Sequence, residues 1–170
     1  MAVPKPVERA KAPPLHALTT YQGPARRAVI AFKERGRREL SVPFAALLAT
    51  GAVRLVDHAN LRIVPVPSRP LAALRRGGQH MRLVAERMGT GTVVWPLLRI
   101  DQRTRDSVGL DAAARTANLS GRISVGRVPD SGPVLVVDDV ITTGATATAC
   151  CEALRLAGAN VKGFLALTAT

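Results

Sequence analysis

The sequence is short of aromatic residues and of long hydrophobic runs, and each shortage narrows the class of protein. Aromatic side chains make up 3% of the 170 residues, although 47% of the residues are hydrophobic. This balance predicts a core of Val, Leu, Ile and Ala, as expected where helices cover a buried sheet. No apolar run approaches the roughly 20 residues that span a bilayer, and the opening MAVPKPVERAKAPPL lacks the apolar block of a secretion signal. We therefore expect a cytoplasmic protein without membrane insertion.

Cysteine is equally scarce. The two cysteines, Cys150 and Cys151, are adjacent within a helical pattern. Adjacent thiols in a helix suit neither a metal site nor an ordinary disulfide framework. We expect both to be small core residues.

Acidic residues are outnumbered, because 24 Lys and Arg stand against 12 Asp and Glu and give a net charge of +12. The excess lies before residue 131, since residues 131–170 hold two basic and three acidic side chains. A basic excess attracts polyanions, either a multiply phosphorylated small molecule or nucleic acid. An arginine-rich surface without any ligand explains the charge nearly as well, so charge alone does not define the partner.

Helical and strand patterns alternate along the chain. The first residues are rich in Pro and charge, which predicts a flexible lead-in over residues 1–20 and a single domain over residues 21–170. Strands alternating with helices predict an α/β fold, a mostly parallel and doubly wound sheet flanked by helices. The helices are predicted at 24–35, 41–50 (capped by Ser41 and ended by Gly51), 79–88 and 145–157, and the strands at 61–66, 92–95, 134–137 and 161–167. The loose pattern between 96 and 133 predicts a long loop with a helical stretch near 110–117.

Two adjacent carboxylates, Asp138 and Asp139, follow four aliphatic residues, Val134 to Val137. This order places both acids at the carboxyl end of a buried strand, where open parallel sheets bind their ligands. Adjacent carboxylates repel each other unless a partner is present. Their pairing therefore favours sugar hydroxyls, Mg2+, or both.

The residues that follow, Thr142-Thr143-Gly144-Ala145-Thr146, form a predicted turn into a helix. Gly144 allows backbone angles that other residues avoid, and the amides at a helix start can bind one phosphate, helped by the threonine hydroxyls. A turn of capping residues without a ligand is the alternative. A Walker A loop is excluded in this segment because it has no lysine.

The whole segment 134–146, VLVVDDVITTGAT, resembles the phosphoribosyl-pyrophosphate (PRPP) motif of type I phosphoribosyltransferases. Three further segments are similar to the ComF family of competence proteins and putative amidophosphoribosyltransferases. They are YQGP at 21–24 with Lys33, IVPVPSRP at 63–70 with RRGGQH at 75–80, and RTRDSVGLDAAARTANL at 103–119. The resemblance implies a type I phosphoribosyltransferase fold with a small hood built from the N-terminal helices.

The resemblance also implies a reaction in which pyrophosphate leaves C1 of the ribose and a nitrogen nucleophile arrives. Asp138 and Asp139 would contact the ribose hydroxyls and stabilise the positive charge on the ring, and Mg2+, bound through the ligand, would neutralise the leaving group. Residues Thr142, Thr143, Gly144, Ala145 and Thr146 would hold the 5-phosphate. Pro67, Ser68 and Arg69 would face the pyrophosphate, and Arg103 and Arg105 are candidates for a mobile loop that closes over the site.

The chain departs from the family in several places. It has no cysteine before Cys150, although the family usually carries an N-terminal four-cysteine zinc module, which was lost or lies upstream of the chain start. Gly78 and Gln79 stand where the family has Phe-Asn-Gln, and Ser107 where a glutamine is common. We expect the three histidines, His16, His58 and His80, to be structural or surface residues.

A second hypothesis, motivated by the charge and by the competence relatives, is a non-catalytic accessory in DNA uptake that acts with a helicase or with single-stranded DNA. The few aromatic residues offer little surface for stacking on bases. The acceptor base or amine and the oligomeric state are left open by the sequence.

Overall fold

The structure, a computed structural model, describes residues 13–56, 60–68, 70–75, 77–89, 91–100, 123–130 and 132–170, without the side chains of residues 70, 71 and 75. Statements below concern these residues. Arg69, Arg103 and Arg105, three predicted ligand-binding residues, lie outside them, as does the helical stretch predicted near 110–117.

A five-stranded sheet forms the centre of the fold, in the order β1-β7-β6-β2-β3. Every neighbouring pair in this sheet is parallel, so all carboxyl ends meet at one edge. The strands are β1 (Leu15–Thr20), β2 (Leu61–Pro65), β3 (Thr92–Val94), β6 (Pro133–Ile141) and β7 (Asn160–Ala169). A separate antiparallel pair is formed by β4 (Leu98–Ile100) and β5 (Ile123–Val125). The predicted α/β fold with a mostly parallel sheet is confirmed.

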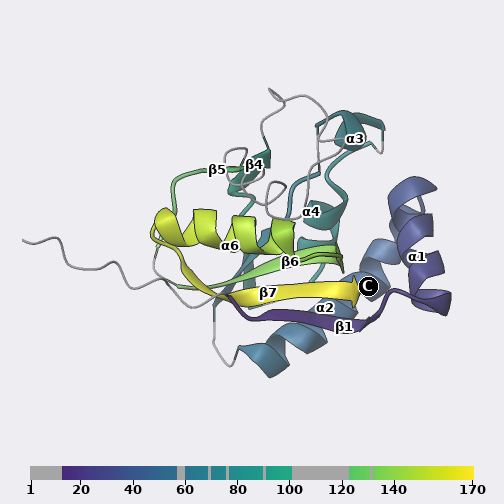
Figure 1. The fold of residues 1–170 in the computed structure, drawn as a ribbon, viewed down its shortest axis with the longest axis horizontal. Helices are drawn as coiled ribbons and strands as arrows, with labels where there is room; N and C mark the ends of the chain where they lie inside the picture. Colours follow the sequence, from purple (N-terminus) through teal and green to yellow (C-terminus); the bar gives the residue numbers. More distant parts are fainter. Residues whose placement is uncertain are drawn as a thin grey trace, which may run out of the picture.

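Helices cover both faces of the sheet (Figure 1). On one face lies α6 (Ala145–Leu156), which packs on Val134 and Val136 of β6, and on the other lie α2 (Ser41–Leu55) and α4 (His80–Ala85), which pack on Leu135 and Val137. The helix α1 (Gly23–Glu34) stands beside the carboxyl ends of the strands (Figure 1). The remaining helical elements are η1 (Arg38–Leu40) and α3 (Pro70–Arg75).

The predicted flexible lead-in over residues 1–20 is wrong for its last six residues, which form β1 and pair with β7. Five of these six residues are exposed. The strand is therefore held mainly by backbone pairing at the sheet edge, and it leaves no hydrophobic alternation for a sequence to reveal.

The helix α2 runs through Gly51, where the sequence predicts its end. A Cβ at Gly51 would lie 2.6 Å from Cδ2 of Leu18 and 3.2 Å from Cδ2 of Leu165. The missing side chain lets α2 lie close to β1 and β7, so this glycine serves packing and not termination. The predicted Ser41 cap is also wrong, because Ser41 Oγ donates to the Arg38 carbonyl oxygen and the helix has no side-chain cap within the described residues.

The strand β6 is longer than the predicted 134–137. It continues through both aspartates to Ile141, which pairs with Ala169 of β7. The antiparallel pair of β4 and β5 lies within the region predicted as one long loop. The extension of β6 has a direct consequence for the site, because residues within a strand alternate between the two faces of the sheet.

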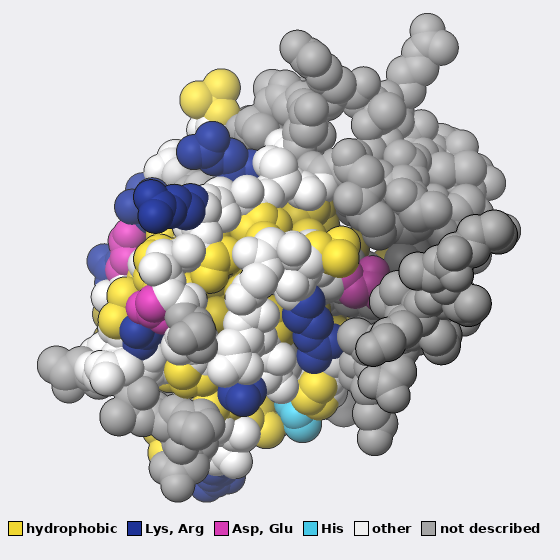
Figure 2. All heavy atoms as spheres, turned by 90° about the vertical axis from the view of Figure 1, so that its left-hand side faces the viewer, with side chains coloured by type: hydrophobic (Ala, Val, Ile, Leu, Met, Phe, Trp, Pro, Cys, Tyr) yellow, Lys and Arg dark blue, Asp and Glu magenta, His cyan; other side chains and the backbone are white. Residues whose placement is uncertain are grey.

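Figure 2 shows the edge opposite the carboxyl ends, where the strands begin. Lys and Arg side chains are more frequent than Asp and Glu on this face as well. Part of the basic surplus of the sequence therefore lies at the edge where the strands begin. No helix among the described residues is long and apolar enough to cross a membrane.

Candidate functional site

The pleat of β6 sends its two adjacent carboxylates to opposite faces of the sheet. Asp138 continues the row of Val134 and Val136 toward α6, and Asp139 continues the row of Leu135 and Val137 toward α2 and α4. The two acids therefore have different surroundings.

The Asp139 carboxylate is enclosed by two cationic or hydrogen-bonding side chains. Lys33 Nζ of α1 lies 3.0 Å from Asp139 Oδ2 and 3.1 Å from Oδ1. His80 Nε2, at the start of α4, lies 2.8 Å from Oδ2. The Asp139 side chain is 3% exposed. Burial by itself raises the pKa of Asp139, but the hydrogen bond from His80 and the charge of Lys33 outweigh it and hold the pKa below its ordinary value.

The network continues from His80 to the loop after β2. His80 Nδ1 lies 2.7 Å from Ser68 Oγ. Ser68 is also held through its backbone, because its N–H donates to Gln79 Oε1 at 2.6 Å and its carbonyl accepts from Gln79 Nε2 at 3.3 Å. The Ser68 amide, which the resemblance assigns to the pyrophosphate, is thus bound by Gln79. Its hydroxyl faces His80 Nδ1, so the N–H, the carbonyl and the hydroxyl of Ser68 all have partners within the protein.

No described cationic side chain forms an ion pair with Asp138, and the charge of Lys33 is the last of the influences on its pKa. Its Oδ1 accepts a hydrogen bond from the Asp139 N–H at 2.8 Å. Burial, together with the nearby Asp139 carboxylate, raises the pKa of Asp138 from 3.8 to about 8. A carboxyl group in this state gains most from a ligand that brings hydroxyl donors or positive charge.

The turn after β6 has the geometry of an anion site. Gly144 has φ of +76°, in the left-handed region that favours glycine, and α6 begins at the next residue. No side chain of the described residues caps this helix start, although the Ala145 N–H donates to Thr143 Oγ1 at 3.4 Å. Thr142 and Thr143 are exposed, and Ala145 and Thr146 are half-buried. Amides at a helix start, with the positive end of the helix dipole, can bind a phosphate here.

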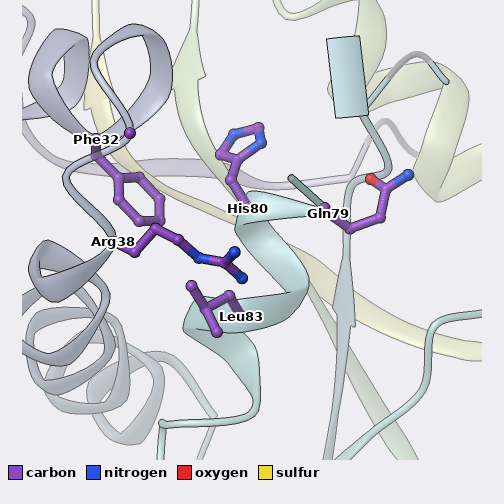
Figure 3. Close-up of a pocket in the computed structure, with 7 residues that line it drawn as sticks. Phe32, Arg38, Gln79, His80 and Leu83 are labelled. Atoms are coloured by element: carbon purple, nitrogen blue, oxygen red, sulfur yellow. The ribbon is translucent and has the colours of Figure 1, made fainter. Parts of the chain in front are cut away.

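A small cavity lies between α1, η1 and α4 and is shown in Figure 3. Its volume is about 20 Å³, which is enough for one water molecule and too small for a nucleobase. Arg38 and Leu83 lie near each other on one side, with Phe32 and His80 above them (Figure 3). The lining residues are Phe32, Gly36, Arg38, Gly78, Gln79, His80 and Leu83.

Most predicted site residues that the structure describes fall at the carboxyl edge of the sheet. Two residues that contact Asp139 were not predicted to belong to the site. Lys33 was not named as a site residue, and His80 was expected to be structural or at the surface. A signal for Lys33 existed, because it lies four residues after buried Val29 and next to buried Phe32, on the inner side of α1. His80 gave none, since its partner Asp139 is 59 residues away.

The cysteine prediction is confirmed, because Cys150 and Cys151 are buried and free in α6. Burial and the nearby Asp138 carboxylate raise the pKa of Cys150, which suits an inert core thiol.

The described residues contain no group of three or more His, Cys, Asp or Glu side chains that could hold a metal ion. Mg2+ commonly binds through substrate phosphates with few protein ligands and several waters. The residues present are therefore compatible with Mg2+ carried by a phosphorylated ligand and not with a cage built by the protein.

No family model matches the chain. It is 37% identical over 92 residues to an adenine phosphoribosyltransferase of Kineococcus radiotolerans, covering 54% of this chain and 49% of the relative. It is 30% identical over 112 residues to an adenine phosphoribosyltransferase of Novosphingobium aromaticivorans, covering 65% of this chain and 62% of the relative. A hypoxanthine/guanine phosphoribosyltransferase of Ferroglobus placidus is 43% identical over 51 residues, 30% of this chain and 27% of the relative. The chain thus spans less than two thirds of the length of each of these relatives.

Solved structures with a similar arrangement include adenine phosphoribosyltransferases. One from Saccharomyces cerevisiae has a TM-score of 0.41 at 18% identity and covers 82% of this chain and 72% of that one. One from Leishmania tarentolae has a TM-score of 0.46 at 16% identity, and the match covers 81% of this chain and 60% of that one. None of these names supports a DNA or helicase partner.

Proposed function

We propose that the protein is a ComF-like type I phosphoribosyltransferase that binds PRPP with Mg2+ and transfers the phosphoribosyl group to a nitrogen acceptor. The observation that carries the proposal is the carboxyl end of β6, where a carboxyl group with a raised pKa is followed by the turn at Gly144 and by the start of α6, which no described side chain caps. The partial sequence matches to purine phosphoribosyltransferases support the same reaction class.

The 5-phosphate of the ligand would bind at Thr142 to Thr146. The positive Gly144 φ opens the turn, and the α6 amides and threonine hydroxyls supply donors. A phosphate at a helix start gains from the helix dipole, typically by about 0.3 to 1 kcal/mol at an exposed site.

Asp138 would accept hydrogen bonds from the ribose hydroxyls. In the reaction the bond between C1 and the pyrophosphate oxygen breaks, a C1–N bond forms, and the acceptor nitrogen releases a proton. Positive charge develops on the ring as the leaving group departs, and the Asp138 carboxylate beside it would stabilise that charge. Asp139 would act mainly by holding Lys33 and His80, because its carboxylate is already engaged by both.

The leaving pyrophosphate would lie at the loop that contains Ser68. When bound, Mg2+ would neutralise charge on the pyrophosphate oxygens. Arg69, Arg103 and Arg105 remain candidates for further contacts on the strength of the resemblance. The hood of α1 and η1 would cover the acceptor, and since the cavity there has room for one water molecule only, the hood would have to open to admit a base.

Titration calorimetry with PRPP and Mg2+ tests the proposal. We expect the wild type to bind and Asp138→Asn to bind at least about tenfold more weakly, because one lost hydrogen bond to a charged group is worth about 1.5 to 3 kcal/mol. Asp130→Asn is the matched control. Asp130 precedes β6 and pairs with Arg62, at the opposite edge of the sheet. This control should bind like the wild type.

Release of pyrophosphate should then be measured with adenine, hypoxanthine and guanine, the bases in the names of the relatives. Absence of PRPP binding to the wild type, or equal binding after Asp138→Asn together with Asp139→Asn, contradicts the proposal. Binding without turnover on any nitrogen acceptor contradicts its catalytic part.

A further inference from the structure

The imidazole of His80 joins the loop after β2 to the Asp139 carboxylate, and neither the motif nor the comparisons assign it a role. We infer that His80 is a positioning residue that turns the Ser68 hydroxyl toward a bound anion, and that anion binding at Ser68 is accompanied by protonation of His80. The inference rests on the proposed function, which places a pyrophosphate group at this loop.

The hydrogen-bond partner of His80 Nε2 determines that this ring nitrogen carries a hydrogen. Asp139 Oδ2 lies 2.8 Å from His80 Nε2, and an ionised carboxylate only accepts hydrogen bonds. The pKa of Asp139 is held below its ordinary value, so this carboxylate is ionised near neutral pH. His80 Nε2 must therefore carry a hydrogen in both the neutral and the charged ring.

The state of Nδ1 then decides which way the Ser68 hydroxyl points. In the neutral ring Nδ1 is an acceptor, so Ser68 Oγ, 2.7 Å away, gives its hydrogen to the ring and offers only lone pairs to a ligand. In the charged ring Nδ1 donates to Ser68 Oγ, and the hydroxyl hydrogen is free to be donated to a phosphate oxygen. An anion at Ser68 therefore favours the charged ring.

The change requires that Nδ1 gains a proton from solvent and that the hydroxyl hydrogen turns, and no heavy atom has to move because the heavy atoms are already held. Gln79 binds both the N–H and the carbonyl of Ser68 and fixes the backbone beside the hydroxyl. The His80 side chain is 10% exposed, and its ring lies edge-on to Phe32 at a centroid distance of 5.8 Å.

Charged groups face His80 from several elements. Asp139 faces the ring from β6, whereas Asp138 points to the other face of the sheet. Lys33 comes from α1 to the Asp139 carboxylate, and Arg38 of η1 lines the cavity beside the ring. Lys33 offsets the charge of Asp139. An arriving anion thus supplies a further negative charge that a protonated His80 can balance.

Proton uptake on binding of pyrophosphate, without metal, tests the inference. It is measured by calorimetry in buffers of different ionisation enthalpy at pH 6 and pH 8.5. At the higher pH the wild type should take up more protons on binding than His80→Gln, whose amide keeps hydrogen-bonding atoms but does not titrate. Pyrophosphate affinity of the wild type should fall by up to about tenfold per pH unit over this range, relative to His80→Gln.

Two further variants separate positioning from general electrostatics. His16→Gln replaces a histidine of β1 and should leave the uptake of the wild type unchanged. Ser68→Ala keeps His80 and Asp139 but removes the hydroxyl, and should lose both affinity and the extra proton. Circular dichroism shows whether each variant is folded, and Ser68→Ala decides the question should His80→Gln not fold.

The outcomes distinguish failure of the His80 inference from failure of the proposed function. Pyrophosphate binding with equal proton uptake in wild type and His80→Gln, or full uptake in Ser68→Ala, overturns the inference and leaves the proposed function standing. Absence of any binding of pyrophosphate or PRPP to the wild type overturns both.

Discussion

Replacing Asp138 by Asn should stabilise the free protein at alkaline pH. The pKa of this carboxyl group is raised from 3.8 to about 8, first by burial and then by the Asp139 carboxylate. Between these two pH values the folded protein keeps a proton on Asp138 that the unfolded chain has lost. Folding therefore takes up a proton, and the free energy of unfolding falls as the pH rises through this range. The amide of the variant does not titrate and removes this loss.

The magnitude follows from the size of the shift. Each pKa unit corresponds to about 1.4 kcal/mol, so a shift of about four units sets an upper limit near 6 kcal/mol. The Asp138 side chain is only half-buried, and water reduces the penalty. We expect a gain of about 2 kcal/mol for Asp138→Asn at pH 8.5 relative to pH 5. The side-chain oxygen of Asn can still accept the hydrogen bond from the Asp139 N–H, which keeps the local geometry.

Urea unfolding of wild type and variant, without ligand, at pH 5, 7 and 8.5 measures the effect. The difference in the free energy of unfolding should grow steadily with pH. Asp139→Asn provides a contrast of opposite sign, because its lowered pKa adds stability that is present at neutral pH and is lost as the pH falls. That variant should cost about 3 kcal/mol at pH 7, since it removes the negative charge that pairs with Lys33 and leaves one oxygen for the two donors Lys33 and His80, and less at pH 3.

A difference between wild type and Asp138→Asn that is the same at pH 5 and pH 8.5 would refute the reasoning. It would mean that Asp138 titrates alike in the folded and unfolded chains. Loss of stability on Asp139→Asn that does not shrink at low pH would likewise contradict the assignment of charge to that residue.

Two substitutions and one labelling experiment test the turn at Gly144, the packing of α2 and the burial of Cys151. Gly144→Ala should cost about 1 to 2 kcal/mol in urea unfolding and weaken PRPP binding, because φ is +76° and a Cβ would lie 3.0 Å from Cδ1 of Leu15; unchanged stability contradicts the turn geometry. Gly51→Ala should change the free energy of thermal unfolding by less than about 1 kcal/mol, since its Cβ would meet Cδ2 of Leu18 at 2.6 Å, the end of a 37% exposed side chain that can turn away, and Ala favours the helix; a loss above about 2 kcal/mol contradicts this freedom of Leu18. Burial raises the pKa of Cys151 to about 12, so a thiol reagent at pH 8 should label it only on unfolding, and rapid labelling of the native protein contradicts its burial.

The central layers of the fold were predictable because their buried residues form regular hydrophobic patterns in the sequence. Val134 to Val137 reads as a buried strand, and the spacing of Val29 and Phe32 reads as a helix that packs on the core. The turn at Gly144 was predictable for a different reason, since the local chemistry of Thr, Gly and a helix start is contained in five consecutive residues.

The parts that could not be predicted depend on contacts between distant segments. The strand β1 is held by pairing with β7, 149 positions on at Leu15 and Phe164. The end of α2 at Leu55, beyond Gly51, depends on the close approach of Leu18. His80 becomes a site residue only because α4 begins beside the end of β6. Local patterns carry no information about such neighbours.

The position of Asp138 and Asp139 inside β6, and not after it, changes how the motif works. Had the strand ended at Val137, both acids could have turned to one ligand. Because the pleat separates them, Asp139 is paired with Lys33 and hydrogen-bonded to His80, and Asp138 is left with a raised pKa beside α6. The pairing of Asp139 with Lys33 reduces the electrostatic repulsion between the Asp139 and Asp138 carboxylates. The second carboxylate is then free to meet the positive charge of a reacting sugar, and Lys33 ties the helix α1 to the strand on which that reaction would take place.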